Sequence, residues 1–276
     1  MDQFERSGLT FPVRDLGAVG GDPVVLLHGF PQDASSYDDV VPHLHAQGLR
    51  TLVPTQRGYI ATALPDRRRD YRMSELVGDV VALLDAAGLE RTHLVGHDWG
   101  GALAWAVAGV RPDRVRSLTM LSTPHPAAMT AALLKSSQGL KSWYMAFFQL
   151  PLLPELALRQ GGQARLARNL SRSGLPPAHV ARYCATLTDR GTATGALNWY
   201  RGLPWSLRAP LPKVGVPTTY VWGRQDFALG RYAAEHTADH VVGDYRFEAL
   251  DAGHWLPETR PEEVATAILE RTRSAT

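Results

Sequence analysis

The chain is 276 residues long, 45% hydrophobic and 20% charged, with a formal net charge of +2. This length suits one large α/β domain, or such a domain with an inserted lid, better than two independent domains. The nearly balanced charge gives no indication of a nucleic-acid partner. The basic run from Arg67 to Arg69 lies between Asp66 and Asp70, which is typical of a solvated loop.

Composition also limits the compartment and the cofactors. The single cysteine, Cys184, excludes an internal disulfide and a cysteine-based zinc site. Mean hydropathy is −0.17, no apolar run reaches the length of a membrane span, and the first residues lack the pattern of a signal peptide. We therefore expect a cytoplasmic protein with no membrane partner.

The first half of the chain alternates short apolar runs with helical patterns. Strands are expected at residues 9–16, 23–27, 50–55, 92–95 and 115–121, and helices at 35–47, 73–87 and 99–110. Run 23–27 is continuously apolar, as in a strand that is buried on both faces. Strands separated by helices indicate a mostly parallel sheet with helices on both sides.

A tight loop, His28-Gly29-Phe30-Pro31, follows the second of these strands, and a proline after an aromatic residue favours a cis peptide bond. The loop is either a plain turn or half of an oxyanion hole. In the second case the backbone N–H of Phe30 pairs with that of Trp99 to hold developing negative charge.

An apolar strand also leads into Gly96-His97-Asp98-Trp99-Gly100-Gly101. A strained strand-to-helix turn, such as a nucleophile elbow, requires small residues two positions before and two positions after its central residue. The central residue is an aspartate, whose attack on an sp3 carbon gives an ordinary ester that water can hydrolyse. The alternative is that Asp98 only caps the helix that follows.

The pattern changes after residue 126. Residues 127–203 contain helical segments only, with breaks at Gly161-Gly162, at 174–177 and at Gly191, and they suggest a lid inserted between core segments 1–126 and 204–276. Aromatic residues gather at 143–149 and 197–201. Such stripes belong more often to a core than to an active site, and both interpretations stay open here.

Two further core strands are expected at residues 217–222 and 245–250, before a last helix at 261–273. Asp226 follows the first strand and His254 follows the second, so both lie at carboxyl ends of neighbouring strands, where open parallel sheets bind ligands. Asp251 is a rival partner for His254. A residue only three places away along the chain would face away from the imidazole, so we predict Asp226 as the partner.

With Asp98, Asp226 and His254 in this order, the sequence resembles the α/β-hydrolase superfamily along its whole length, and its epoxide hydrolase branch most closely. The resemblance rests on the loop from His28, on the turn at Asp98, on Gly253-His254-Trp255 and on a tyrosine in each aromatic stretch, Tyr144 and Tyr200. It implies an α/β fold with a mostly parallel sheet flanked by helices and a helical lid. The sequence departs from the family at Thr55 and Ile60, where Asp and Gly are usual.

The resemblance also implies a mechanism. Asp98 attacks an epoxide carbon while Tyr144 and Tyr200 donate hydrogen bonds to the opening oxygen, which gives an alkyl-enzyme ester. His254, oriented by Asp226, then activates the water that hydrolyses the ester, and a diol leaves. The expected partners are a small apolar epoxide and water, with no metal and no cofactor, while substrate size and oligomeric state stay open.

Dehalogenases offer a second interpretation, because they share the Asp nucleophile and the His–Asp pair. Haloalkane dehalogenases typically hold the halide with the Trp after the nucleophile and an Asn after His-Gly; Trp99 is present, but Phe30 fills the second position. Haloacetate dehalogenases place an Arg beside the nucleophile, and none is found here. A third class, a binding protein of this fold without turnover, is disfavoured because every expected catalytic residue type is in place.

Overall fold

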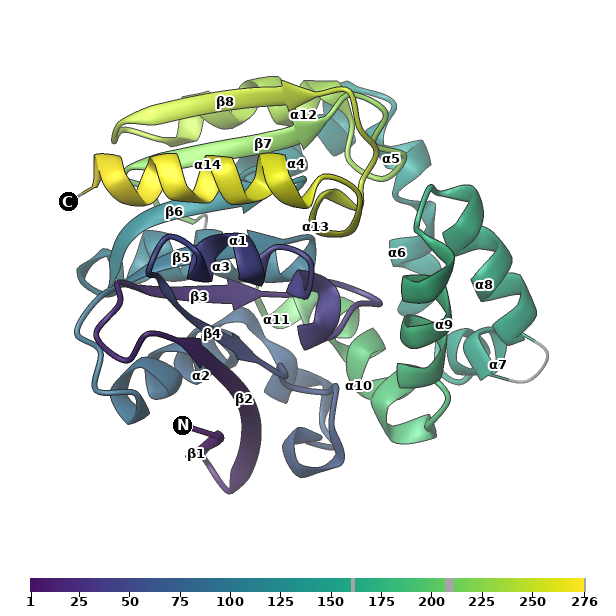
Figure 1. Cartoon of the computed structure of the whole chain (residues 1–276). Coiled ribbons are helices and arrows are strands. Elements are labelled where there is room, and N and C mark those ends of the chain that lie inside the picture. The colour runs from purple at the N-terminus through teal and green to yellow at the C-terminus, as the bar shows by residue number, and fades with distance from the viewer. Residues whose placement is uncertain (160–161, 207–210, 276) are drawn as a thin grey trace.

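The computed structural model describes residues 1–159, 162–206 and 211–275. An eight-stranded sheet in the order β1-β2-β4-β3-β5-β6-β7-β8 forms its centre (Figure 1). The first two pairings, β1 with β2 and β2 with β4, are antiparallel, and all others are parallel. This confirms the predicted mostly parallel sheet. The strands are β1 Gln3–Arg6, β2 Leu9–Gly17, β3 Pro23–Leu27, β4 Arg50–Pro54, β5 Thr92–His97, β6 Val115–Leu121, β7 Thr218–Gly223 and β8 Tyr245–Leu250.

The central strands owe their continuous apolar sequence to burial on both faces. All five residues of β3 are buried. Val24 and Leu26 pack into one apolar cluster, whereas Val25 and Leu27 pack into the other, because successive side chains of a strand point to opposite faces.

Helices cover both faces of the sheet (Figure 1). One apolar cluster lies beneath α1 (Val41–His45) and α14 (Pro261–Ser274). The other lies beneath α2 (Met73–Ala86), α3 (Trp99–Val110) and α12 (Arg231–Glu235). This three-layer arrangement aligns the carboxyl ends of β3, β5, β6, β7 and β8 along one edge of the sheet.

Between β6 and β7 the described residues form helices and no strand. We call these helices the helical insert; it lies beside the carboxyl ends of the strands (Figure 1). No helix in the described ranges is long and apolar enough to span a membrane. The insert comprises α4 Pro126–Lys135, α5 Gln138–Lys141, α6 Trp143–Phe148, α7 Leu153–Arg159, α8 Gly162–Arg172, α9 Pro177–Thr186, α10 Arg190–Arg201 and α11 Leu203–Ser206.

The three breaks predicted within the insert have different outcomes. The break at 174–177 does separate α8 from α9, but the predicted break at Gly191 is wrong. Gly191 lies in the first turn of α10, whose N-terminus is capped instead by the side chain of Asp189. Gly161, in the remaining predicted break, is outside the described residues.

The predicted helix at 35–47 is two short pieces, a 3-10 helix at Ala34–Tyr37 and α1. Pro42 explains the division, since it has no N–H to donate within a continuous helix and is tolerated in the first turn of a new one. The sequence analysis also missed β1. Ser7 and Gly8 both adopt positive φ between β1 and β2, which suits a two-residue hairpin turn.

One buried ion pair holds the helical insert together. Arg201, at the end of α10, contacts Glu155 of α7 with Nη2 and Oε2 2.9 Å apart, and both side chains are almost fully buried. The same guanidinium donates to the backbone carbonyls of Phe148 and Leu150. Arg201 therefore fixes the end of α6 against α10.

We expect Arg201→Met to lower the free energy of unfolding by roughly 3 kcal/mol, because it leaves Glu155 buried without its counter-charge. Amide exchange should accelerate across residues 143–148. Arg190→Met is the matched control: this exposed arginine begins the same helix, and its loss should change stability by less than about 0.5 kcal/mol. Urea denaturation and hydrogen exchange test this. Equal effects of the two substitutions would show that the ion pair between Arg201 and Glu155 does not hold the insert together.

Candidate active site

The turn between β5 and α3 holds Asp98 in strained backbone geometry, with φ 50° and ψ −119°. Neighbouring backbone makes the strain possible. A Cβ on Gly96 would lie 2.4 Å from the carbonyl oxygen of Gly100, and a Cβ on Gly100 would lie 2.1 Å from that of Leu27. The Asp98 side chain makes no capping hydrogen bond to α3, so the capping interpretation is wrong.

The carboxylate of Asp98 is held from the loop after β3. The backbone N–H of Phe30 donates to Asp98 Oδ1 at 2.8 Å, and the peptide bond from Phe30 to Pro31 is cis. Trp99 is the first residue of α3, so its N–H lies at the positive end of the helix. The Asp98 side chain keeps 18% of its surface exposed, which leaves it accessible to a ligand.

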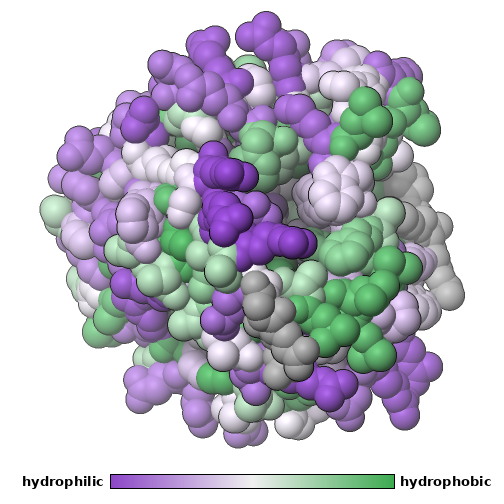
Figure 2. Space-filling view, turned by 90° about the vertical axis from the view of Figure 1, so that its right-hand side faces the viewer, coloured by the Kyte–Doolittle hydropathy of each residue, from purple (hydrophilic) through white to green (hydrophobic). Residues whose placement is uncertain are grey.

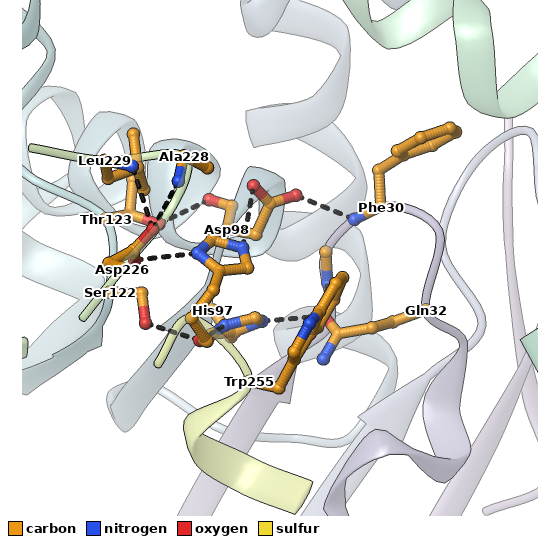
Figure 3. A network of polar contacts seen from close by, with 12 residues as sticks. Phe30, Gln32, His97, Asp98, Ser122, Thr123, Asp226, Ala228, Leu229 and Trp255 are labelled. Atoms are coloured by element: carbon orange, nitrogen blue, oxygen red, sulfur yellow. Dashed lines mark hydrogen bonds and ion pairs between the residues drawn. The ribbon is translucent and has the colours of Figure 1, made fainter. Parts of the chain in front are cut away.

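His254 lies between the carboxylates of Asp98 and Asp226, both labelled in Figure 3. Its Nδ1 is 2.8 Å from Asp226 Oδ2, and its Nε2 is 3.7 Å from Asp98 Oδ2. The other oxygen of Asp226 accepts the backbone N–H groups of Ala228 and Leu229 at 2.8 and 2.9 Å. Asp226 is therefore fixed by its own loop and orients the imidazole.

The rival carboxylate, Asp251, points elsewhere. It accepts a hydrogen bond from the side-chain amide of Gln225 at 2.8 Å and is exposed. The structure thus brings His254 together with Asp226 and not with Asp251.

The charges of this group shift its titration. Burial lowers the pKa of His254, but the charge and hydrogen bond of Asp226, with a further contribution from Asp98, outweigh burial and raise that pKa to about 10. Burial raises the pKa of Asp98, but His254 and the N–H of Phe30 outweigh it, so the net shift is downward. In the free protein Asp98 is a carboxylate at neutral pH, as a nucleophile must be.

Both insert tyrosines lie near this carboxylate, since Tyr200 packs against Trp99 and Phe30, which flank Asp98, and Tyr144 packs against Tyr200. Burial is the main cause that raises the pKa of Tyr144 and of Tyr200, and the charge of Asp98 raises both further. Their ring centres are 6.1 Å apart, and the ring of Tyr200 lies 4.8 Å from that of Trp99. Phe30 and Phe148 complete an aromatic wall around Tyr200, at 5.4 and 4.9 Å. The phenols are therefore neutral donors in an apolar setting.

Several polar residues around the site were missed by the sequence analysis. Thr123 Oγ1 donates to the carbonyl of Asp98 at 2.8 Å, and Ser122 Oγ donates to the carbonyl of His254 at 2.7 Å (Figure 3). His97 Nε2 lies 2.8 Å from the same carbonyl of His254. Ser122 and Thr123 directly follow β6, so their place at a strand end was the available signal.

A buried polar chain continues from His97 toward the helical insert. His97 Nδ1 is 2.8 Å from Gln32 Oε1, which also accepts the N–H of Gly29. Gln32 Nε2 donates to Glu258 Oε1 at 2.6 Å, and Tyr183 of α9 donates to the same oxygen at 2.7 Å. The chain ties the insert to the loop that holds Asp98.

Among the described residues, no group of three or more His, Cys, Asp or Glu side chains is placed to hold a metal ion. The described site contains two carboxylates with one imidazole between them, and two phenols lie nearby. Such an arrangement supports nucleophilic attack followed by base-assisted hydrolysis.

Comparison with known proteins defines the class. Residues 22–261 match the sequence model of a family described as alpha/beta hydrolase fold. The chain belongs to this family, and it is a hydrolase.

Individual relatives narrow the comparison to epoxide hydrolases. The chain is 35% identical to the AB hydrolase superfamily protein YfhM of Bacillus subtilis, over 96% of this chain and 94% of that protein. It is 31% identical to epoxide hydrolase A of Mycobacterium tuberculosis, over 96% and 95%. The crystal structure of epoxide hydrolase A from Mycobacterium thermoresistibile superposes with a TM-score of 0.84 at 28% identity, covering 98% of this chain and 97% of that one. These relatives support an epoxide hydrolase function and confirm the resemblance.

The crowding at the strained turn predicts that Gly100→Ala lowers the free energy of unfolding by about 2 kcal/mol, because the new methyl meets the backbone of β3. Gly20→Ala is the control, since a Cβ there would meet nothing within 4 Å. That variant should stay within about 0.5 kcal/mol of the parent. Urea unfolding of both variants decides the matter, and a stable Gly100→Ala protein would show that the turn tolerates a side chain.

Proposed function

We propose that this chain hydrolyses epoxides to vicinal diols through a covalent ester on Asp98, under a lid formed by residues 127–203. The observation that carries the proposal is His254 held between two carboxylates, 2.8 Å from Asp226 and 3.7 Å from Asp98, with the ring of Tyr200 packed against Trp99 beside them. The curated relatives named as epoxide hydrolases support the same reaction.

Ring opening would use Asp98 and the two tyrosines. An oxygen of Asp98 forms a bond to one ring carbon while the bond between that carbon and the epoxide oxygen breaks. The departing oxygen takes hydrogen bonds from Tyr144 and Tyr200, and a proton from one of them. The raised pKa values keep both phenols protonated until the alkoxide develops beside them.

Hydrolysis would use His254. A water molecule gives one proton to the imidazole and attacks the ester carbonyl carbon of Asp98, while the N–H groups of Phe30 and Trp99 stabilise the oxyanion. The bond between the carbonyl carbon and the alkyl oxygen then breaks, and the diol takes up the proton held by His254. The acid left on Asp98 gives its remaining proton to the imidazole, which restores both the carboxylate and the protonated histidine. No metal or organic cofactor enters either step.

The electrostatics support this order of events. A raised pKa keeps His254 protonated in the free protein, where it is a poor base but stabilises the Asp98 carboxylate. Ester formation neutralises Asp98 and removes one of the two carboxylates that raise the pKa of His254. Only after the ester has formed can the imidazole pass its proton to the phenolate left by ring opening and act as a base.

The environment of the site also supports the substrate class and compartment. Aromatic rings of Phe30, Trp99 and Phe148 surround Tyr200, which suits a small apolar epoxide. The sole cysteine, Cys184, is free, which fits the reducing cytoplasm.

The competing functions gain no support from these contacts. In a haloalkane dehalogenase the Trp after the nucleophile would donate to a halide, whereas the ring of Trp99 here packs edge-to-face against that of Tyr200 at 4.8 Å. Phe30, at the second halide position, presents a ring and no donor. A binding protein without turnover would release no diol in the experiment that follows.

Oxygen labelling in a single turnover tests the nucleophile. With enzyme in excess in labelled water, we expect unlabelled diol and label in the peptide that contains Asp98. His254→Gln should accumulate the ester, so that the protein mass rises by one substrate. His240→Gln, at a half-buried histidine that stacks on His125 and is not among the proposed catalytic residues, is the matched control and should turn over without an adduct.

Label in the first-turnover diol, with no adduct in His254→Gln, would mean that Asp98 acts as a general base on water. Turnover of a haloalkane or of haloacetate, but not of an epoxide, would support the dehalogenase reaction instead.

The tyrosines make a separate prediction. Tyr144→Phe and Tyr200→Phe should each slow ester formation by roughly 10²- to 10³-fold, the usual loss for one donor to a developing oxyanion. Tyr232→Phe, on α12 and stacked on His236, should leave the rate unchanged. Rapid mixing with an epoxide measures this step alone. An unchanged rate in both insert variants would assign the two aromatic rings to packing.

A further inference from the structure

Large apolar side chains are exposed along the helical insert. Of the fifteen large hydrophobic residues exposed among the described residues, eight fall between positions 133 and 156. Of these eight, Leu134, Leu140 and Trp143 are the most exposed, at 84%, 81% and 67%. Single exposed leucines are ordinary on a protein surface, but a gathered group marks a binding surface. We call this group the apolar face: Leu133, Leu134, Leu140, Trp143, Leu150, Leu152, Leu153 and Leu156.

Arginines lie beside the apolar face. Arg165, Arg168 and Arg172 share one exposed side of α8, while Leu166 and Leu170 pack inward on the other. Within the described part of the chain, none of these three arginines has an acidic group within 4.0 Å. Figure 2 shows strongly hydrophilic side chains near the centre of this side of the molecule and hydrophobic ones gathered beside them.

The charge of the chain is concentrated in this segment. Residues 127–203 contain nine Lys and Arg but only two Asp and Glu, a net charge of +7, whereas the whole chain carries +2. One of the two acids, Glu155, is buried against Arg201 and contributes nothing to the outer surface. The rest of the molecule is therefore net negative, and the positive charge lies on one side.

We propose that the apolar face and the arginines of α8 dock the protein on an anionic phospholipid surface. Exposed Leu and Trp side chains beside arginines match the boundary between acyl chains and acidic headgroups. A second copy of the chain suits this surface poorly, since a symmetric contact would place one net charge of +7 against another. An acidic protein partner would need an apolar patch with carboxylates placed beside it. An anionic lipid surface supplies apolar chains and acidic headgroups together.

Docking is compatible with the whole-chain hydropathy. We expected no membrane partner from the mean hydropathy, the lack of a long apolar run and the lack of a signal-peptide pattern, none of which shows which side chains share a face. The docked side of α6 adjoins the candidate site, because exposed Trp143 precedes Tyr144. This places the site beside the lipid where apolar epoxides partition, a consequence that rests on the proposed function, whereas docking itself does not.

Vesicle sedimentation with the full chain tests the proposal. The protein should bind vesicles of phosphatidylcholine with phosphatidylglycerol, and not phosphatidylcholine alone. Arg165→Gln with Arg168→Gln should reduce the partition coefficient roughly 30-fold, at about a kilocalorie per basic residue. Arg91→Gln with Lys213→Gln removes the same charge from exposed positions on the core and should not change binding.

The apolar face has its own matched pair. Leu134→Ser with Leu140→Ser should reduce binding roughly tenfold. Val19→Ser with Val242→Ser, also highly exposed but on the core, should have no effect. Turnover of a soluble substrate and the urea midpoint should be the same in all four variants, which separates lost docking from lost folding or lost activity.

Three results would overturn the proposal. The first is a folded protein that does not bind anionic vesicles. The second is binding that both core controls weaken as much as the insert variants do. The third is protein binding in place of vesicle binding, seen either as a concentration-dependent dimer or as a complex with polyglutamate. If the insert variants abolish that dimer or complex, the surface binds protein and not lipid.

Discussion

The left-handed backbone at Asp98 depends on neighbouring segments that approach it without side chains. Strain of this kind costs about 1–3 kcal/mol and persists only where the surroundings dictate it. Here the dictating contacts are the close passage of Gly96 over Gly100 and of Gly100 over the end of β3. Gly29 adds a third, since a Cβ there would lie 2.3 Å from Cβ of Asp98. The turn lifts the carboxylate out of the sheet edge, where the loop from β3 and the side chain of His254 reach it.

A second constraint joins the core to the helical insert. The buried carboxyl of Glu258 accepts from Gln32 and from Tyr183, so one group contacts both the loop near Asp98 and helix α9. Burial raises the pKa of Glu258 above its ordinary value, against these two hydrogen bonds. Burying this carboxyl is tolerated only when both donors are in place, because a buried polar group without hydrogen-bond partners destabilises the folded state. The position of α9 and the geometry near Asp98 are thus coupled.

Local motifs could be predicted from the sequence because each is contiguous and needs special residues. The turn at Asp98, the loop at Phe30 and the two strand ends at Asp226 and His254 are of this kind, and the parallel sheet then brings them to one edge. The chain through Glu258 could not be predicted, since its members are far apart and of common types. The helix break placed at Gly191 was wrong for a related reason: glycine alone does not end a helix when an aspartate caps its start.

The sequence pattern also did not predict which side chains are exposed. The aromatic stretch at 143–149 divides between two environments, and the alternation of a helix decides which residue goes where. Tyr144 faces Tyr200, whereas Trp143, one position and about 100° away around α6, is 67% exposed. The choice left open between packing and catalysis therefore had no single answer for the stretch as a whole. A short helix can present one aromatic residue to the candidate site and the next one to solvent, provided that Arg201 holds its end in place.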